Sequence, residues 1–375
     1  MKPRTDGWSS RTSATPGRWG WRAALVLAFA MTVHPAGVDA QNAAEAGTSI
    51  IPFPFFFYTP ETNLAFGATV IVYKTMPGTD RPSSLQPTFV YTVKNQIILS
   101  VASTAYLSRG NVRLLGSASF MQFPNTFWGV GNDAPDTAEE DYTPRRFSLE
   151  LDLQRRFSTD WFVGGSLLVA HRRLVETEPG GLLATAAIPG VDDGQAISLG
   201  ISLVHDSRDN IIYPRRGGYY QLRVARFDGM IGSEYDFTSY QLDTRQYLPV
   251  TSSHVLVFRG LLMATDGTAP FELLPQLGGE ILLRGYFAGR YRDQTLLAFQ
   301  SEYRLPVWRR IGAVGFVGVG QVADRLSTFA VDRFNASVGL GLRFLLSRDD
   351  QLNLRADFGF GEGSSGFYLG IGEVF

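Results

Sequence analysis

Residues 334–345 read FNASVGLGLRFL, an alternation of apolar residues with small or polar ones. Residues 352–361, LNLRADFGFG, repeat the alternation. A period of two is typical of a β-strand, because successive side chains of a strand point to opposite faces. In both segments one face is continuously apolar and the other carries glycine, polar and charged residues. This pattern favours a barrel wall with lipid outside and a polar lumen inside.

The last residues of the chain continue the pattern. Phe367, Leu369 and Ile371 share one face, and by the same alternation Phe375 falls on it too. We therefore predict a final strand over 366–375 whose apolar face meets lipid. A terminal amphipathic strand that closes on phenylalanine resembles the sorting signal of bacterial outer-membrane barrels.

The composition narrows the function classes. The 375 residues include no cysteine, which excludes disulfides and thiolate metal sites. The formal net charge is −1, so the charge balance does not favour a nucleic acid partner. The 40 glycines and 13% aromatic residues suit close-packed lumenal strands and aromatic girdles at the membrane interfaces.

The N-terminus has the features of a secretory signal. Arginines precede the apolar run Ala23–Val33, and Val38-Asp39-Ala40 offers a cleavage site before Gln41. The run of about 11 residues is shorter than the roughly 20 of a spanning helix. We predict a signal peptide over 1–40, a linker over 41–50 that is too short for a folded periplasmic domain, and a barrel over 51–375.

Sixteen candidate strands follow, and an even number suits a bacterial barrel with both termini in the periplasm. No later segment is apolar and long enough for a spanning helix, so a membrane-embedded chain must close into a barrel. The predicted strands are 51–58, 64–73, 85–94, 96–107, 111–122, 144–157, 161–173, 194–207, 217–228, 233–248, 253–264, 293–306, 311–322, 334–346, 350–361 and 366–375.

Most connections alternate between short polar turns and longer segments, although 74–84 and 208–216 are both long for periplasmic turns. The longer segments, which we assign to the external side, are 123–143, 174–193, 265–292 and 323–333. Sixteen strands enclose a lumen too wide for wall side chains to fill. We therefore expect a long loop to plug it in part, and 265–292 is the candidate. By composition alone, the same segment is an external loop with turn glycines and a solvated arginine.

Short motifs along the chain resemble the bacterial surface antigen family, the BamA/TamA-type outer-membrane assembly barrels. Together they cover about residues 50–375. The matching stretches are Thr126–Asn132, Asp206–Asn210 with Pro214 and Gly217, Arg245–Tyr247, Arg284–Tyr286, Glu302–Arg304 and Gly339–Arg343. The resemblance implies that an external loop folds into the lumen and presents Arg284, Gly285 and Tyr286 to the inner wall. It also implies that Glu302 pairs with Arg284, since a buried arginine without a carboxylate is costly. Gly285 would permit a tight turn.

Two departures from the family pattern limit the inference. The family often has an acidic residue where this chain has Gly318. Either Asp357, two strands on and facing inward, substitutes for it, or the loop is held more weakly. The periplasmic POTRA domains, which collect clients in the family, are absent from the sequence, so the resemblance does not extend to a complete assembly machine.

The closing seam is expected to be the weakest strand pair. A barrel has no edge only if its first and last strands pair. Pro52 and Pro54 lack amide donors, and Gly370 offers no side chain to pack across the seam. A seam of this kind could open sideways towards lipid.

Signatures of catalysis are poor. The mature chain has three histidines, His171, His205 and His254, and none has metal-ligand spacing. The acidic cluster around Asp136 in an external loop suits solvent better than a cation. We therefore expect neither an enzyme nor a cofactor.

The leading interpretation is a barrel in the bacterial outer membrane that assists insertion or translocation of protein or lipid. The alternative is a passive pore or structural barrel; a lipid-modifying enzyme ranks third. The expected partners are outer-membrane lipid, lipopolysaccharide and client outer-membrane proteins, without nucleic acid.

Overall fold

A computed structural model describes residues 48–74, 83–185, 188–347 and 351–375. The predicted signal peptide over 1–40 and the first part of the linker lie outside these ranges. The last three linker residues belong to the first strand, which begins at Thr48 instead of Ile51.

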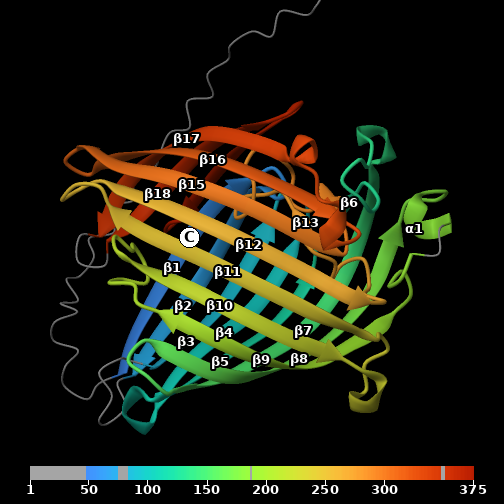
Figure 1. Ribbon diagram of the computed structural model, residues 1–375, viewed down its shortest axis with the longest axis horizontal. Helices are drawn as coiled ribbons and strands as arrows, with labels where there is room; N and C mark the ends of the chain where they lie inside the picture. The colour runs from blue at the N-terminus through green and yellow to red at the C-terminus, as the bar shows by residue number, and fades with distance from the viewer. Residues whose placement is uncertain (1–47, 75–82, 186–187, 348–350) are drawn as a thin grey trace, which may run out of the picture. The chain divides into compact units, whose positions relative to one another are not determined.

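Sixteen antiparallel strands form the wall of a closed barrel (Figure 1). They are β1 (Thr48–Thr59), β2 (Asn63–Lys74), β3 (Ser83–Thr92), β4 (Ile97–Leu107), β5 (Val112–Gln122), β7 (Glu140–Arg156), β8 (Trp161–Thr177), β9 (Gly194–Asp206), β10 (Gly217–Phe227), β11 (Phe237–Pro249), β12 (Val255–Gly267), β15 (Thr295–Trp308), β16 (Ile311–Ala323), β17 (Asn335–Ser347), β18 (Leu352–Gly361) and β19 (Ser364–Ile371). Each pairs with its neighbour in chain order, and β19 pairs with β1 to close the ring.

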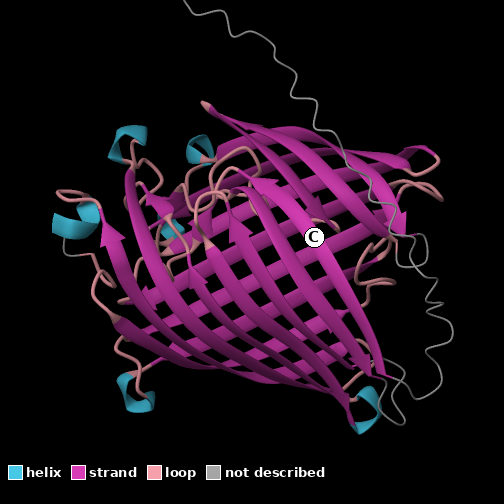
Figure 2. Cartoon of the chain, turned by 180° about the vertical axis from the view of Figure 1, so that it is seen from behind, coloured by secondary structure: helices cyan, strands magenta, loops and turns pink. Residues whose placement is uncertain are grey.

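The remaining elements are short and belong to the connections (Figure 2). They are β6 (Asn125–Phe127), β13 (Gln276–Leu277), β14 (Tyr291–Arg292), the α-helix α1 (Leu182–Thr185), and 3-10 turns at Ser108–Gly110, Asp136–Ala138, Gly229–Ile231, Leu326–Thr328 and Val331–Arg333. No helix in the described ranges has the length and apolar character needed to cross a membrane.

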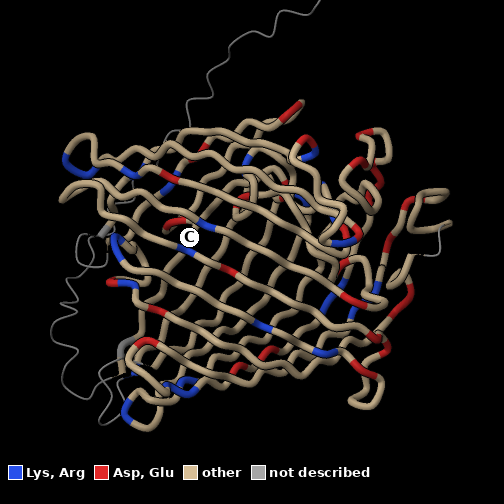
Figure 3. The backbone as a smooth tube through the Cα atoms, viewed as in Figure 1, with Lys and Arg blue, Asp and Glu red and all other residues tan. Residues whose placement is uncertain are grey.

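The predicted alternation is confirmed in the wall. In β17, Leu340 is 73% exposed on the outside, whereas its neighbours Gly339 and Gly341 are buried on the inside. The same phase holds in β18, where Phe358 is exposed and Asp357 is buried. Charged residues occur at the strand ends and loops and also within the strands (Figure 3), but those within β15, β17 and β18, such as Glu302, Arg343 and Asp357, are buried on the inward face, whereas the exposed outward residues are apolar. The outer surface is therefore an apolar band that suits lipid.

The prediction for the end of the chain is wrong. The last strand ends at Ile371, and Gly372, with φ of 84°, turns the chain. Phe375 is 5% exposed and packs on the inward-facing Tyr247 and Val257. Arg304 Nη2 donates to the Phe375 backbone oxygen at 2.6 Å. Phe375 therefore lies inside the barrel, because the glycine turn breaks the alternation on which the prediction depended.

Wall orientation predicts an unequal response to charge. Leu340→Arg places a guanidinium in hydrocarbon and should lower the free energy of unfolding by roughly 2–4 kcal/mol near the membrane midplane. Ala102→Arg is the control, because Ala102 is exposed on the inward face of β4. Its loss should be much smaller. Urea unfolding of both variants in lipid vesicles measures the difference, and equal losses would contradict the assigned faces.

Candidate functional site

The connection between β12 and β15 packs against the inner wall. The short strands β13 and β14 pair with each other at the base of its tip. The tip includes Leu282 and Leu283. Both leucines are buried in a cluster with Leu277 of β13 and with inward-facing residues of β12, β15 and β16, which are Leu261, Leu296, Ala298 and Val322. The cluster is apolar, so hydrophobic burial as well as charge holds this connection in place.

Glycines in β16 provide the space for these leucines. A Cβ at Gly318 would lie 3.1 Å from Leu283 Cδ1, and one at Gly320 would lie 2.6 Å from Leu277 Cδ1. Gly318 is also the position where the family that the sequence resembles often has an acidic residue. In this chain a leucine of the loop fills that space, and the carboxylate comes from another strand.

Arg284 lies in a closed ionic site. It forms ion pairs with Glu302 of β15 and Asp357 of β18, and its guanidinium stacks 3.6 Å from the centroid of the Phe316 ring. Arg284 is 1% exposed, and both carboxylates are fully buried. Of the two alternatives left open by the sequence, the geometry therefore favours substitution by Asp357. Together Glu302 and Asp357 surround the arginine from two strands.

More arginines surround the same two carboxylates. Asp357 also accepts from Arg343 at 2.5 Å and from Arg355 at 3.2 Å, and Glu302 accepts from Arg304 at 2.8 Å. Additional carboxylates come from Glu373, 2.8 Å from Arg343, and from Glu280 of the loop, which contacts Arg355. Such a network tolerates burial because each charge has a partner, whereas removal of one member leaves an uncompensated charge.

The backbone of the loop tip lies directly on β18. Gly285 has φ of 116°, and a Cβ there would lie 2.7 Å from the Phe360 carbonyl carbon. A Cβ at Gly359 would lie 2.6 Å from the Arg284 carbonyl oxygen. At Gly361 a Cβ would overlap the Tyr286 ring. Glycine is thus required on both sides of the contact, in the loop and in the wall.

The same loop contacts β19 on one side of the seam and the turn that follows β1 on the other. The Gly285 amide donates to the Tyr368 hydroxyl of β19 at 3.0 Å, and that hydroxyl donates to the Tyr286 carbonyl at 3.3 Å. On the other side, the Ala288 amide donates to Glu61 Oε1 at 2.6 Å, in the turn that joins β1 and β2. The loop therefore bridges the seam.

The seam itself contains little pairing. All 12 residues of β1 pair with β2, but within the described residues the ladder between β1 and β19 consists of the single pair Tyr58–Leu369. Tyr58 and Phe367 add a ring contact with centroids 5.7 Å apart. Residues 48–57 have no ladder partner on that side among the described residues.

Two prolines of β1 place nitrogen atoms that carry no hydrogen on the side of the strand that borders the seam. Pro52 and Pro54 lie opposite Val70 and Ala68 of β2 within an unbroken ladder. Because proline cannot donate, that ladder depends on the amides of the residues between them, such as Phe53. The amide positions of Pro52 and Pro54 therefore face away from β2, where no partner strand lies.

The environment of Gly370 differs from the prediction, which placed it at the seam without a side chain to pack across it. It faces inward, and a Cβ there would lie 3.0 Å from Arg355 Nη2 and 3.2 Å from Glu280 Oε1. Its small size makes room for the ion pair between these residues. The position matters for the ionic network and less for packing across the seam.

Three long connections, 123–143, 174–193 and 265–292, meet in one buried apolar cluster. Its members are Phe127, Tyr142, Leu183 and Phe271. Burial raises the pKa of Glu272, although the guanidinium of Arg172 lies 3.1 Å away and opposes the shift.

Sequence reasoning missed Glu61, Glu280, Tyr368 and Glu373 as site residues. Strand parity was the available signal for Tyr368, because it places the side chain on the inward face of β19. No local pattern marks Glu61, since its partner is a backbone amide of a distant loop. In the described ranges, no group of histidine and acidic residues could hold a metal ion.

Comparison with known families agrees with this architecture. Residues 93–375 match the model of the Omp85 superfamily domain. The chain belongs to the Omp85 superfamily. Among curated proteins, none matches the sequence.

Solved structures of other Omp85-like barrels share the fold. BamA from Haemophilus ducreyi lacking POTRA domains 1–3 aligns with a TM-score of 0.61 at 15% identity, over 87% of this chain and 70% of that one. CdiB from Acinetobacter baumannii gives 0.55 at 14%, over 86% and 59%. CdiB from Escherichia coli gives 0.56 at 11%, over 86% and 62%. This Omp85 chain therefore spans less than two thirds of the CdiB chains.

Coupling between Arg284 and Glu302 is the first prediction from this site. The variants Arg284→Met and Glu302→Gln and their combination should show non-additive losses of about 0.5–3 kcal/mol, because each leaves the other charge short of a partner. Urea unfolding in vesicles measures the cycle. The exposed pair Arg226–Asp236 is the control and should couple by at most about 1 kcal/mol. Additive losses at Arg284 and Glu302 would argue against the pairing.

A second prediction tests the close backbone contact. Gly359→Ala inserts a methyl group against the Arg284 carbonyl, so the loop must shift, at a cost of about 1–3 kcal/mol. The loop should then be cleaved faster by protease in the folded barrel. Gly315→Ala is the matched control, because its Cβ would meet only Leu340 Cδ2, at 3.9 Å. Equal protease resistance of the two variants would mean that the contact does not hold the loop.

Proposed function

We propose that this Omp85 barrel assists the insertion or translocation of protein or lipid at the bacterial outer membrane by opening sideways at the seam between β1 and β19. The observation that carries the proposal is the single ladder pair Tyr58–Leu369. A wall built only to separate two compartments would be expected to pair its first and last strands along their length.

An unpaired strand edge in a membrane needs a partner. Backbone amides and carbonyls left without hydrogen bonds in hydrocarbon are costly, so the free side of β1 favours the addition of another strand. Strand addition of this kind is a common mode of polypeptide recognition. Pro52 and Pro54 remove two donors from that edge, so an added strand would gain fewer hydrogen bonds and would leave more easily.

The inward loop supplies a way to control the opening. It holds the β1–β2 turn through Glu61 and β19 through Tyr368. Arg284, between Glu302 and Asp357, fixes the loop to β15 and β18. We infer that the loop acts as a lock on the seam as well as a partial plug, with outer-membrane lipid and client outer-membrane proteins as the partners.

A passive pore is the second candidate, and one observation favours it. Ala102 of β4 and Glu150 of β7 point inward and are exposed. The inner wall that they belong to, away from the loop, therefore meets solvent. A barrel of this kind that conducts ions steadily and does not open sideways would be a pore.

Locking the seam separates the two functions. The pair Tyr58→Cys and Leu369→Cys, in a chain without other cysteines, should form a disulfide across the seam. We expect the oxidised barrel, reconstituted in vesicles, to lose any acceleration of the folding of a urea-denatured eight-stranded outer-membrane barrel, and to regain it after reduction.

The control disulfide joins Leu340→Cys and Phe358→Cys, which are direct partners in a fully paired part of the wall. It should leave the acceleration unchanged. If the unmodified barrel shows no acceleration but a steady conductance in planar bilayers, the pore is the better description. If acceleration is present and both disulfides leave it intact, the seam is not the route.

A further inference from the structure

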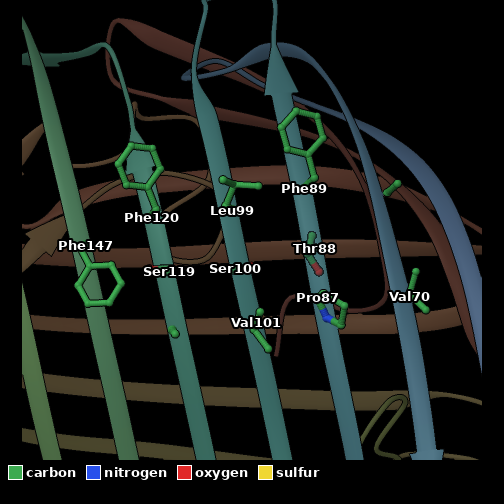
Figure 4. A pocket seen from close by; sticks show the side chains of 12 residues that line it. Val70, Pro87, Thr88, Phe89, Leu99, Ser100, Val101, Ser119, Phe120 and Phe147 are labelled. Carbon is green, nitrogen blue, oxygen red and sulfur yellow. The ribbon is translucent and has the colours of Figure 1, made fainter.

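A groove of about 480 Å³ crosses the outer face of the wall from β2 to β7 (Figure 4). Phe89, Leu99 and Phe147 form one edge and are 46%, 47% and 49% exposed. The smaller Ala118 and Pro87 lie in the next row of outward residues. The groove results from this difference in size between adjacent rows. Most of the residues that line it face outward in the lipid-exposed band, and Thr88, Ser100 and Ser119 lie between them on the same strands with inward-facing side chains.

The groove has no means of binding a polar partner. Nearby hydroxyl groups are directed to one another on the inner face, where Ser119 and Ser148 lie 2.8 Å apart and Thr88 donates to Thr69 at 2.9 Å. The outward side chains along it are apolar. A ligand headgroup or a charged peptide would therefore lose its hydration there without compensation.

The groove also cannot accept an added strand. The ladders from β3 to β4, β4 to β5 and β5 to β7 are continuous beneath it. Only the β2–β3 ladder is interrupted, opposite Pro87, which has no N–H, and Thr69 Oγ1 donates to the Pro87 carbonyl at 2.9 Å instead. The backbone thus offers no row of free groups such as the one along β1.

We propose that an acyl chain of a membrane lipid occupies this groove as a specific site. The groove is continuous with the face that meets hydrocarbon, and a flexible apolar chain can fill it. Atoms that line an empty groove lose dispersion contacts, and an acyl chain restores them. The site starts one strand from the seam, because Ala68 and Val70 in its lining lie opposite Pro54 and Pro52 of β1. A bound chain would therefore border the β1–β2 hairpin.

Photolabelling tests the proposal. The barrel is reconstituted in phosphatidylcholine vesicles that contain a trace of phosphatidylcholine with a diazirine on its acyl chain, and labelled residues are located by mass spectrometry. We expect the groove strands to be labelled several-fold more than the outward faces of β17 and β18. Ala118→Trp, which fills the groove, should remove the excess.

Ala356→Trp is the matched control, since Ala356 faces outward in β18 and lies outside the groove. It should leave the excess unchanged, and heat-modified gel migration shows whether each variant is folded. If Ala118→Trp does not fold, Val101→Phe replaces it. Even labelling around the wall, or an excess that survives the groove-filling change, would overturn the proposal. A crosslink between two copies of the chain that Ala118→Trp abolishes would overturn it too, because it would identify a second copy as the occupant.

Discussion

A strand in hydrocarbon has to pair its amides and carbonyls on both sides, and the structure of this barrel depends on that constraint. Fifteen of the sixteen junctions between wall strands have long antiparallel ladders among the described residues, although the β2–β3 ladder is interrupted opposite Pro87. The junction of β1 and β19 does not, since it has one pair. A continuous wall with a single weak line confines any sideways opening to one place.

The loop between β12 and β15 bears on how the weakly paired seam stays closed. A barrel with a weakly paired seam stays closed only if other contacts hold the two sides together, and the loop contacts β19 and the β1–β2 turn. It can do so only because it is fixed elsewhere, by leucines packed over glycines of β16 and by Arg284 among buried carboxylates. The ion pairs thus matter less as a source of net stability than as a means of setting the position of the loop.

Much of the wall could be predicted from the sequence, because the face of a strand residue follows from its neighbours in the chain. The inward phase of Arg343 and Asp357 and the outward phase of Leu340 came from the period of two alone. The environment of Gly318 could not, since the leucine that fills its space comes from a distant loop. The same holds for Gly370, whose neighbours are Arg355 and Glu280. The face of the wall on which a strand residue lies is a local property of the sequence, whereas the residues that it contacts are not.

The sequence by itself determined that the chain forms strands and which side of each strand is apolar, because both follow from local alternation. The position of Arg284 against the inner wall was an expectation from the resemblance to a family, and alternation did not give it. Only the tertiary structure decided that Phe375 turns into the lumen, that the seam keeps one pair and that a groove crosses the outer wall. Each of these depends on which residues of other strands lie alongside, and that is fixed by register and closure around the ring, not by the order of residues within one strand.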